Sequence, residues 1–156
     1  MTEGFKLKDV RDIAMHNYSI ELKVWGEIPS ERDISGRLGV QATTFFKKGE
    51  AKSPTREWQQ SVWSLSVEPS ETQREWPSLE EGLGALLELL APLKPQLEEL
   101  KHIYQVAISC GDFVSGFGGG PTLSASILQR LADLGLDLNL SIYSHDEPVS
   151  QKISEK

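Results

Sequence analysis

Residues 18–26 read YSIELKVWG, and the strict alternation of apolar and polar side chains in this stretch decides the fold class. Successive side chains of a β-strand point to opposite faces, so every second residue shares a face. The apolar face carries Tyr18, Ile20, Leu22 and Val24. The opposite face carries Ser19, Glu21, Lys23 and Trp25. The stretch therefore predicts a strand with one face in the core and the other open.

The same alternation recurs in three later segments, which lie at 61–67, 104–110 and 136–143. A weaker strand is expected at 40–46, followed by a polar loop at 47–57. Helices are predicted near 30–39, 78–90 and 124–135 from apolar spacing and from the Ser and Gly residues suited to their ends. Leu97 and Leu100 suggest one further short helix. Strands and helices thus alternate along most of the chain.

Strands buried on both faces usually read as continuous apolar runs, whereas these segments alternate. We therefore expect helices on one face of a mostly antiparallel sheet. The order predicts an α+β fold with a ferredoxin-like βαββαβ core, extended by a further helix and strand. Residues 18–143 are expected to form one domain, after an N-terminal extension at 1–17 and before a mobile polar tail at 144–156.

The formal net charge of −7 disfavours nucleic acids and anionic membranes as partners, because both attract cationic surfaces. The chain has one cysteine, Cys110, so an intramolecular disulfide is excluded. No apolar run has the length of a signal peptide core or of a membrane span. These features predict a cytoplasmic protein.

Over residues 18–143 the chain carries, in this order, VWG, IPSERDISGRLGVQAT, KKGE, WSL, the leucine-rich helix and LGLDLNLSIY. This ordered set resembles the bacterial proteins catalogued as domain of unknown function 4279. That family has no assigned reaction. The resemblance therefore implies a compact bacterial domain and no catalytic residues.

The glycine-rich run at 109–124, SCGDFVSGFGGGPTLS, lies between a predicted strand and a predicted helix, as a phosphate-binding loop would. Its Gly116–Gly120 segment lacks the last glycine of the dinucleotide fingerprint, and the run lacks the lysine of a P-loop. We expect a flexible connection and no bound cofactor.

Cys110 could act as a nucleophile with a histidine such as His16, His102 or His145 as its base. However, it shares the apolar face of its strand, where a thiol stays protonated. The adjacent residues His145, Asp146 and Glu147 are better explained by a solvated tail than by a metal site. We therefore predict no catalytic residue and no metal.

A basic loop, FFKKGEAKSPTREW at 45–58, could bind an anion through Lys47, Lys48, Gly49 and Arg56. Together with Gly116–Gly120, it motivates an alternative function as a small anionic-ligand domain or a minor enzyme. The simpler interpretation is a solvated loop whose Phe and Trp side chains are anchored in the core.

Two large aromatic residues, Trp25 and Tyr143, are predicted on the polar face of the sheet. Exposed aromatic side chains commonly anchor protein partners. The leading hypothesis is a non-enzymatic protein-interaction module that self-associates or binds a basic partner, as an immunity protein binds a toxin. Alternatively, residues 5–14 could fold over these rings.

Overall fold

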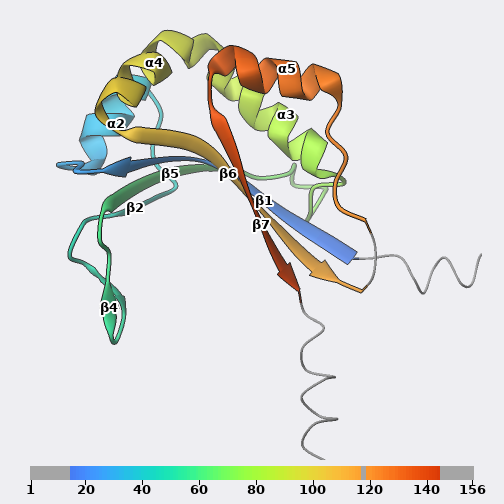
Figure 1. Cartoon of the computed structure of the whole chain (residues 1–156), viewed down its shortest axis with the longest axis horizontal. Coiled ribbons are helices and arrows are strands. Elements are labelled where there is room, and N and C mark those ends of the chain that lie inside the picture. The colour runs from blue at the N-terminus through green and yellow to red at the C-terminus, as the bar shows by residue number, and fades with distance from the viewer. Residues whose placement is uncertain (1–14, 117–118, 145–156) are drawn as a thin grey trace, which may run out of the picture.

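The computed structural model describes residues 15–116 and 119–144, and these include a five-stranded sheet in the order β2-β5-β1-β6-β7 (Figure 1). The strands are β1 (Met15–Gly26), β2 (Thr44–Phe46), β5 (Ser61–Val67), β6 (Gln105–Ser115) and β7 (Asp137–Ser144). Neighbouring strands are antiparallel except for β6 and β7, which are parallel. The fold is therefore α+β with a mostly antiparallel, mixed sheet.

The helices pack on one side of this sheet, as the alternating strands predict (Figure 1). They are α2 (Glu31–Leu38), α3 (Leu79–Leu90), α4 (Lys94–Ile103) and α5 (Ala125–Leu134), with the 3-10 turn η1 (Ala91–Leu93) between α3 and α4. In the part of the chain that the structure describes, no helix covers the other side of the sheet. The polar residues of the strands therefore face outward.

Two of the predicted helix starts are closed by side-chain caps. Ser78 Oγ accepts a hydrogen bond from Glu81 N, and Ser124 Oγ accepts one from Ile127 N, each at 3.1 Å. These bonds satisfy backbone N–H groups that have no partner inside the helix. Ser30 also occupies an N-cap position but makes no side-chain cap bond, and its carbonyl accepts from Asp33 N instead.

The hydrophobic core lies between the sheet and the helices. Ile20, Leu22 and Val24 of β1 are almost completely buried against α3, whose leucines face them. Trp63 of β5 is fully buried, and its indole N–H donates to Ser35 Oγ at 3.0 Å. Fully burying a side chain such as Ile20 or Leu22 contributes about 1.5–3 kcal/mol, so this layer holds the helices on the sheet.

The structure corrects several predicted boundaries. The strand predicted at 40–46 is only Thr44–Phe46, and the predicted polar loop contains a hairpin of β3 (Ala51–Ser53) and β4 (Arg56–Glu57). Backbone hydrogen bonds between Trp58 and the turn at Gly49 and Glu50 close this hairpin. Its residues are mostly exposed and polar, so hydrophobic periodicity could not predict it.

The glycine-rich run is also less of a loop than predicted, because β6 continues through Gly111 to Ser115. β1 begins at Met15, so its first three residues belong to the sheet instead of the predicted N-terminal extension. The remainder of that extension lies outside the described residues, as do the tail residues after Ser144.

A matched pair of substitutions tests the packing of α3. A Cβ atom on Gly82 would overlap Ile20 Cδ1 and lie 3.0 Å from the Trp76 ring, whereas one on Gly84 would lie 3.6 Å from Ile127 Cδ1. In urea unfolding, Gly82→Ala should lower the free energy of unfolding by about 1–3 kcal/mol through overpacking. Gly84→Ala should raise it by up to about 1 kcal/mol, because alanine favours the helix. Equal effects would contradict this packing.

Candidate functional site

The side of the sheet without helices is termed the open face. It is formed by the odd-numbered residues of β1, β6 and β7 and the even-numbered residues of β2 and β5, as the pairing register requires. Trp25 and Tyr143, which the sequence predicts on one face, both belong to it.

One end of the open face, beside the hairpin, carries three aromatic side chains and a valine, which we term the hairpin-end cluster. It consists of Trp25, Phe46, Trp58 and Val62. Trp25 lies opposite Val62, and Val62 lies opposite Phe46. The ring of Phe46 stacks on Trp58 with centroids 4.6 Å apart, and Lys52 Nζ lies 4.5 Å from the Trp58 ring centroid.

This cluster corrects the prediction that the loop aromatics anchor in the core. Only Phe45 packs against the core, while Phe46 points to the open face because adjacent strand residues alternate. Trp58, the last residue of the basic loop, is not among the binding residues that the sequence singles out. The hairpin brings it back beside Phe46.

The other end of the open face carries a second aromatic group, the far-end pair of Phe113 and Tyr143. Their rings stack with centroids 4.7 Å apart, and they are 38% and 49% exposed. Phe113 lies opposite Asn17 of β1, eight positions from Trp25. At about 3.3 Å per residue, the two aromatic groups are therefore roughly 26 Å apart.

Polar side chains separate the two aromatic groups. Trp25 and Trp58 border a hollow of about 350 Å³ whose other lining residues include Lys23, Ser109, Asn139 and Ser141. Lys23 Nζ lies 3.3 Å from the Glu21 carboxylate, which also accepts a hydrogen bond from Ser66 Oγ. The centre of the open face thus offers hydroxyl and amide groups with paired charges.

Two of the predicted anion-binding residues of the basic loop are already bonded to other groups of the chain. Lys47 Nζ donates to the Pro29 carbonyl, and Lys48 Nζ pairs with Glu27 at 2.9 Å. Gly49 lies at a turn with φ 93°, a conformation that glycine adopts without strain. Arg56 lines a hollow of about 430 Å³ beside Lys52, Trp58, Gln59 and Gln60.

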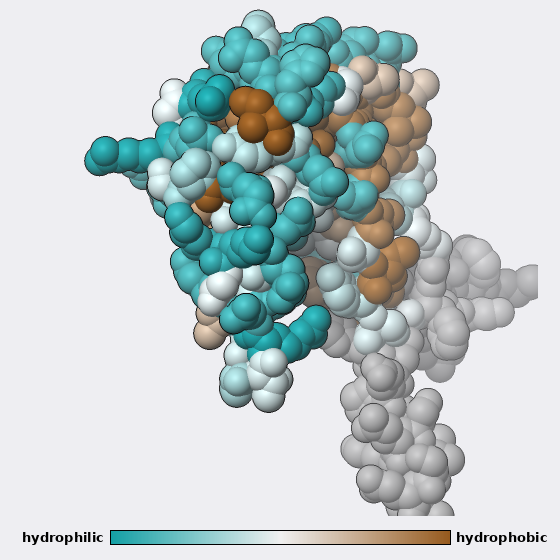
Figure 2. Space-filling model, turned by 60° about the vertical axis from the view of Figure 1, so that its left-hand side comes forward, coloured by the Kyte–Doolittle hydropathy of each residue, from teal (hydrophilic) through white to brown (hydrophobic). Residues whose placement is uncertain are grey.

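Figure 2 brings this side of the molecule forward and shows a mainly hydrophilic surface with separate hydrophobic patches.

The basic loop and the glycine-rich run do not form one site. Lys48 is bonded through its backbone N–H to Ser61, which lies opposite Gly26 at one end of β1. Gly116 follows Ser115, which lies opposite Met15 at the other end. The far end of the run is held separately, because Ser124 N donates to the Glu80 carboxylate at 2.6 Å. The two segments of the predicted anion site therefore lie at opposite ends of β1.

Cys110 lies in the core, as predicted from its strand face, and is only 2% exposed. Burial, together with the charge of Glu21, raises the pKa of its thiol to about 12. Of the three histidines considered as a base for Cys110, His16 is engaged elsewhere, since His16 Nδ1 lies 2.7 Å from the carboxylate of Asp112. His145 lies outside the described residues, as do Asp146 and Glu147.

The His16–Asp112 pair was not predicted, because the two residues are 96 positions apart and only the β1–β6 register brings them together. Asp112 is 1% exposed, and the ring of Tyr18 stacks on His16. Burial and the charge of Asp112 raise the pKa of Tyr18. The buried carboxylate thus fixes the orientation of the imidazole.

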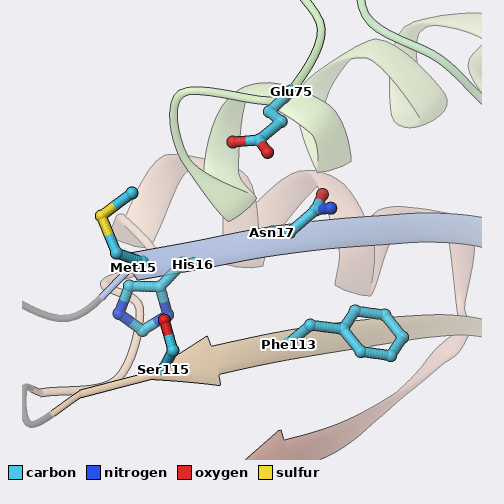
Figure 3. A pocket seen from close by; sticks show the side chains of 6 residues that line it. All are labelled: Met15, His16, Asn17, Glu75, Phe113 and Ser115. Atoms are coloured by element: carbon cyan, nitrogen blue, oxygen red, sulfur yellow. The ribbon is translucent and has the colours of Figure 1, made fainter. Parts of the chain in front are cut away.

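His16 borders a hollow of about 410 Å³ at the far end of β1, whose other lining residues are Met15, Asn17, Glu75, Phe113 and Ser115 (Figure 3). The carboxylate of Glu75 points toward β1 from the segment before α3. Among residues 15–116 and 119–144, no three histidine, cysteine or acidic side chains gather as metal ligands.

The buried thiol gives a direct test of the strand faces. Native protein should react with a disulfide reagent such as DTNB at least 100-fold more slowly at mildly alkaline pH than urea-unfolded protein. The reason is that the native thiol is buried and, with its pKa raised to about 12, remains protonated at this pH. In a Cys110→Ala, Ser109→Cys variant, the thiol faces outward and should react rapidly. Fast reaction of native Cys110 would show that the face assignment is wrong.

No curated protein and no solved structure gives a significant match. None of the helices in the described ranges is long and apolar enough to cross a membrane. A family model described as a domain of unknown function, DUF4279, matches residues 16–145 and so spans the sheet from β1 to β7. The chain belongs to the DUF4279 family.

Proposed function

We propose that the protein is a non-enzymatic protein-interaction domain that binds its partner on the open face. The observation that carries this proposal is the presence of stacked aromatic rings at both ends of a sheet face that no described helix covers. Clusters of aromatic side chains with surrounding polar groups resemble the energetic centres and rims of protein interfaces.

The spacing of the aromatic groups favours a macromolecular partner. Small-molecule sites are concave and enclose most of the ligand. Here the hairpin-end cluster and the far-end pair are roughly 26 Å apart along the strands, and polar residues lie between them. A protein surface can contact both groups at once and can hydrogen-bond to the polar centre.

The charge of the chain favours a basic partner. A net charge of −7 would accelerate the approach of a cationic protein and slow that of nucleic acids or anionic membranes. Binding of a basic toxin by an immunity-type protein is one function of this kind. The proposed location is the cytoplasm, where the free thiol of Cys110 would remain reduced.

We also propose that β1, α2, β2, β5, α3 and β6 form a ferredoxin-like βαββαβ core. The antiparallel order β2-β5-β1-β6 supports this interpretation, with α5 and β7 as the added helix and strand. In this arrangement the open face is the side left free by both helices of the core.

The alternative function, binding of a small anionic ligand, has less support. Lys47 and Lys48 already have partners within the chain, and Lys52 lies against the Trp58 ring. Arg56 is the remaining cation of that loop for which the structure records no side-chain partner among the described residues. One exposed arginine beside a hollow that Glu57 also lines makes a weak anion site.

Two single substitutions, one at each end of the open face, test the proposal. Trp25→Ser and Phe113→Ser should each weaken binding of the natural protein partner, captured from the native cell extract and then purified, by about 30-fold or more, as for interface hot spots. The measurement is isothermal titration calorimetry with the purified partner.

The matched control is Leu128→Ser on α5, where the side chain is 46% exposed but lies on the helix side. It should leave affinity unchanged. The proposal would be overturned if the control weakens binding as much as the two variants do. It would also be overturned if the open face instead binds single-stranded RNA in a salt-dependent way.

A further inference from the structure

The outer edge of β7 is the feature of the sheet that the proposed function does not use. β7 is the last strand in the order β2-β5-β1-β6-β7, and within residues 15–116 and 119–144 no strand pairs with its outer side. Its backbone therefore presents a row of hydrogen-bonding groups. Such an edge is a template for pairing with another strand.

β7 lacks the devices that usually protect an edge. Its sequence, DLNLSIYS, has no proline and no basic residue, and its pairing with β6 continues without a bulge from Asp137 to Ser144. Charged residues, prolines, bulges and short strands are the common means of blocking edge pairing. The only charge on β7 is Asp137, at its start.

The opposite edge of the sheet differs in these respects. β2 has only three residues, is followed directly by Lys47 and Lys48, and leads into the β3–β4 hairpin beside it (Figure 1). One edge of the sheet is therefore short and flanked by charge, while the other is long and nearly uncharged.

The side chains of β7 add an apolar surface to this edge. Leu140 and Ile142 point to the helix side, yet they are 41% and 63% exposed because the helices do not extend over them. The sequence predicts these leucine and isoleucine side chains opposite the polar face, as in a core strand. Their exposure indicates a surface that a neighbouring strand would cover.

We propose that two copies of this chain pair through β7, edge to edge and antiparallel, to form one continuous ten-stranded sheet. A two-fold axis perpendicular to the sheet at Leu140 keeps the helices of both copies on the same side. Leu140 then lies opposite Leu140 of the second copy, and Leu138 lies opposite Ile142. All three apolar side chains of the edge become covered.

The charge pattern favours a second copy of this chain as the partner of the β7 edge. Two chains with a net charge of −7 repel each other over most of their surfaces, but residues 138–144 carry no charge. In this register Asp137 lies opposite Tyr143 of the second copy, so no like charges meet directly. A basic partner would gain no ion pair on this edge beyond Asp137.

The size of the contact sets its expected strength. A contact one strand wide belongs to the small interfaces of less than about 1,200 Å² in total, which are typically reversible. The dimer should therefore dissociate on dilution. The inference does not depend on the proposed function, because pairing leaves both open faces uncovered and side by side.

Sedimentation velocity over a concentration series from low micromolar to near millimolar tests the dimer. Wild-type protein should shift from monomer to dimer, and Ile142→Lys should remain monomeric over the same range. Ile142 is mostly exposed, so this variant should keep the wild-type circular dichroism spectrum. Leu128→Lys, on the exposed side of α5, and Trp25→Ser, on the open face, should both dimerise like wild type.

The register is tested by a single cysteine. In a Cys110→Ala background, Leu140→Cys should form an intermolecular disulfide under mild oxidation, since opposed residues of antiparallel strands have Cα atoms about 4.5–5.5 Å apart. Leu128→Cys should not. A wild-type chain that stays monomeric, a dimer that survives Ile142→Lys, or a dimer lost in Leu128→Lys would each overturn the proposal.

Discussion

The central position of β1 is the constraint on which the rest of the structure depends. β1 pairs with β6 along almost its whole length and with β5 over residues 20–26, so both halves of the sheet are attached to it. Its even-numbered residues must be buried and its odd-numbered residues must not be. A one-residue shift in either pairing would move Leu22 and Val24 out of the core and Lys23 into it, which fixes the register strongly.

This one-sided burial produces both the open face and the exposed apolar edge of β7. The described helices lie on the apolar side, so none of them covers the aromatic residues on the other side, and the hairpin lies beside one end of the open face. Because the helix layer ends before β7 does, Leu140 and Ile142 emerge from under it. Both proposed interaction surfaces thus depend on how far the helices extend over the sheet.

Two of the charged residues that the sequence marks as candidates, Lys47 and Lys48, attach the start of the hairpin to the segment after β1. Glu80, which the sequence does not mark, attaches the end of the glycine-rich run to α3. Tyr104 similarly donates to Asp33 at 2.8 Å and links α4 to α2. A sequence shows that such residues are polar and accessible, but it does not show which of their hydrogen-bonding groups are already satisfied.

Local patterns are sufficient to predict the fold class, the faces of the main strands, the positions of α3 and α5 and the burial of Cys110. All of these follow from local periodicity or from a cap three residues away, which any tertiary arrangement preserves. Long-range packing is needed to establish that β7 pairs parallel to β6, that Phe113 stacks on Tyr143, that Trp58 returns to Phe46, and that His16 meets Asp112. An alternating strand looks the same whichever neighbour it has, because its partner and register are set by the summed burial of residues far apart in the chain.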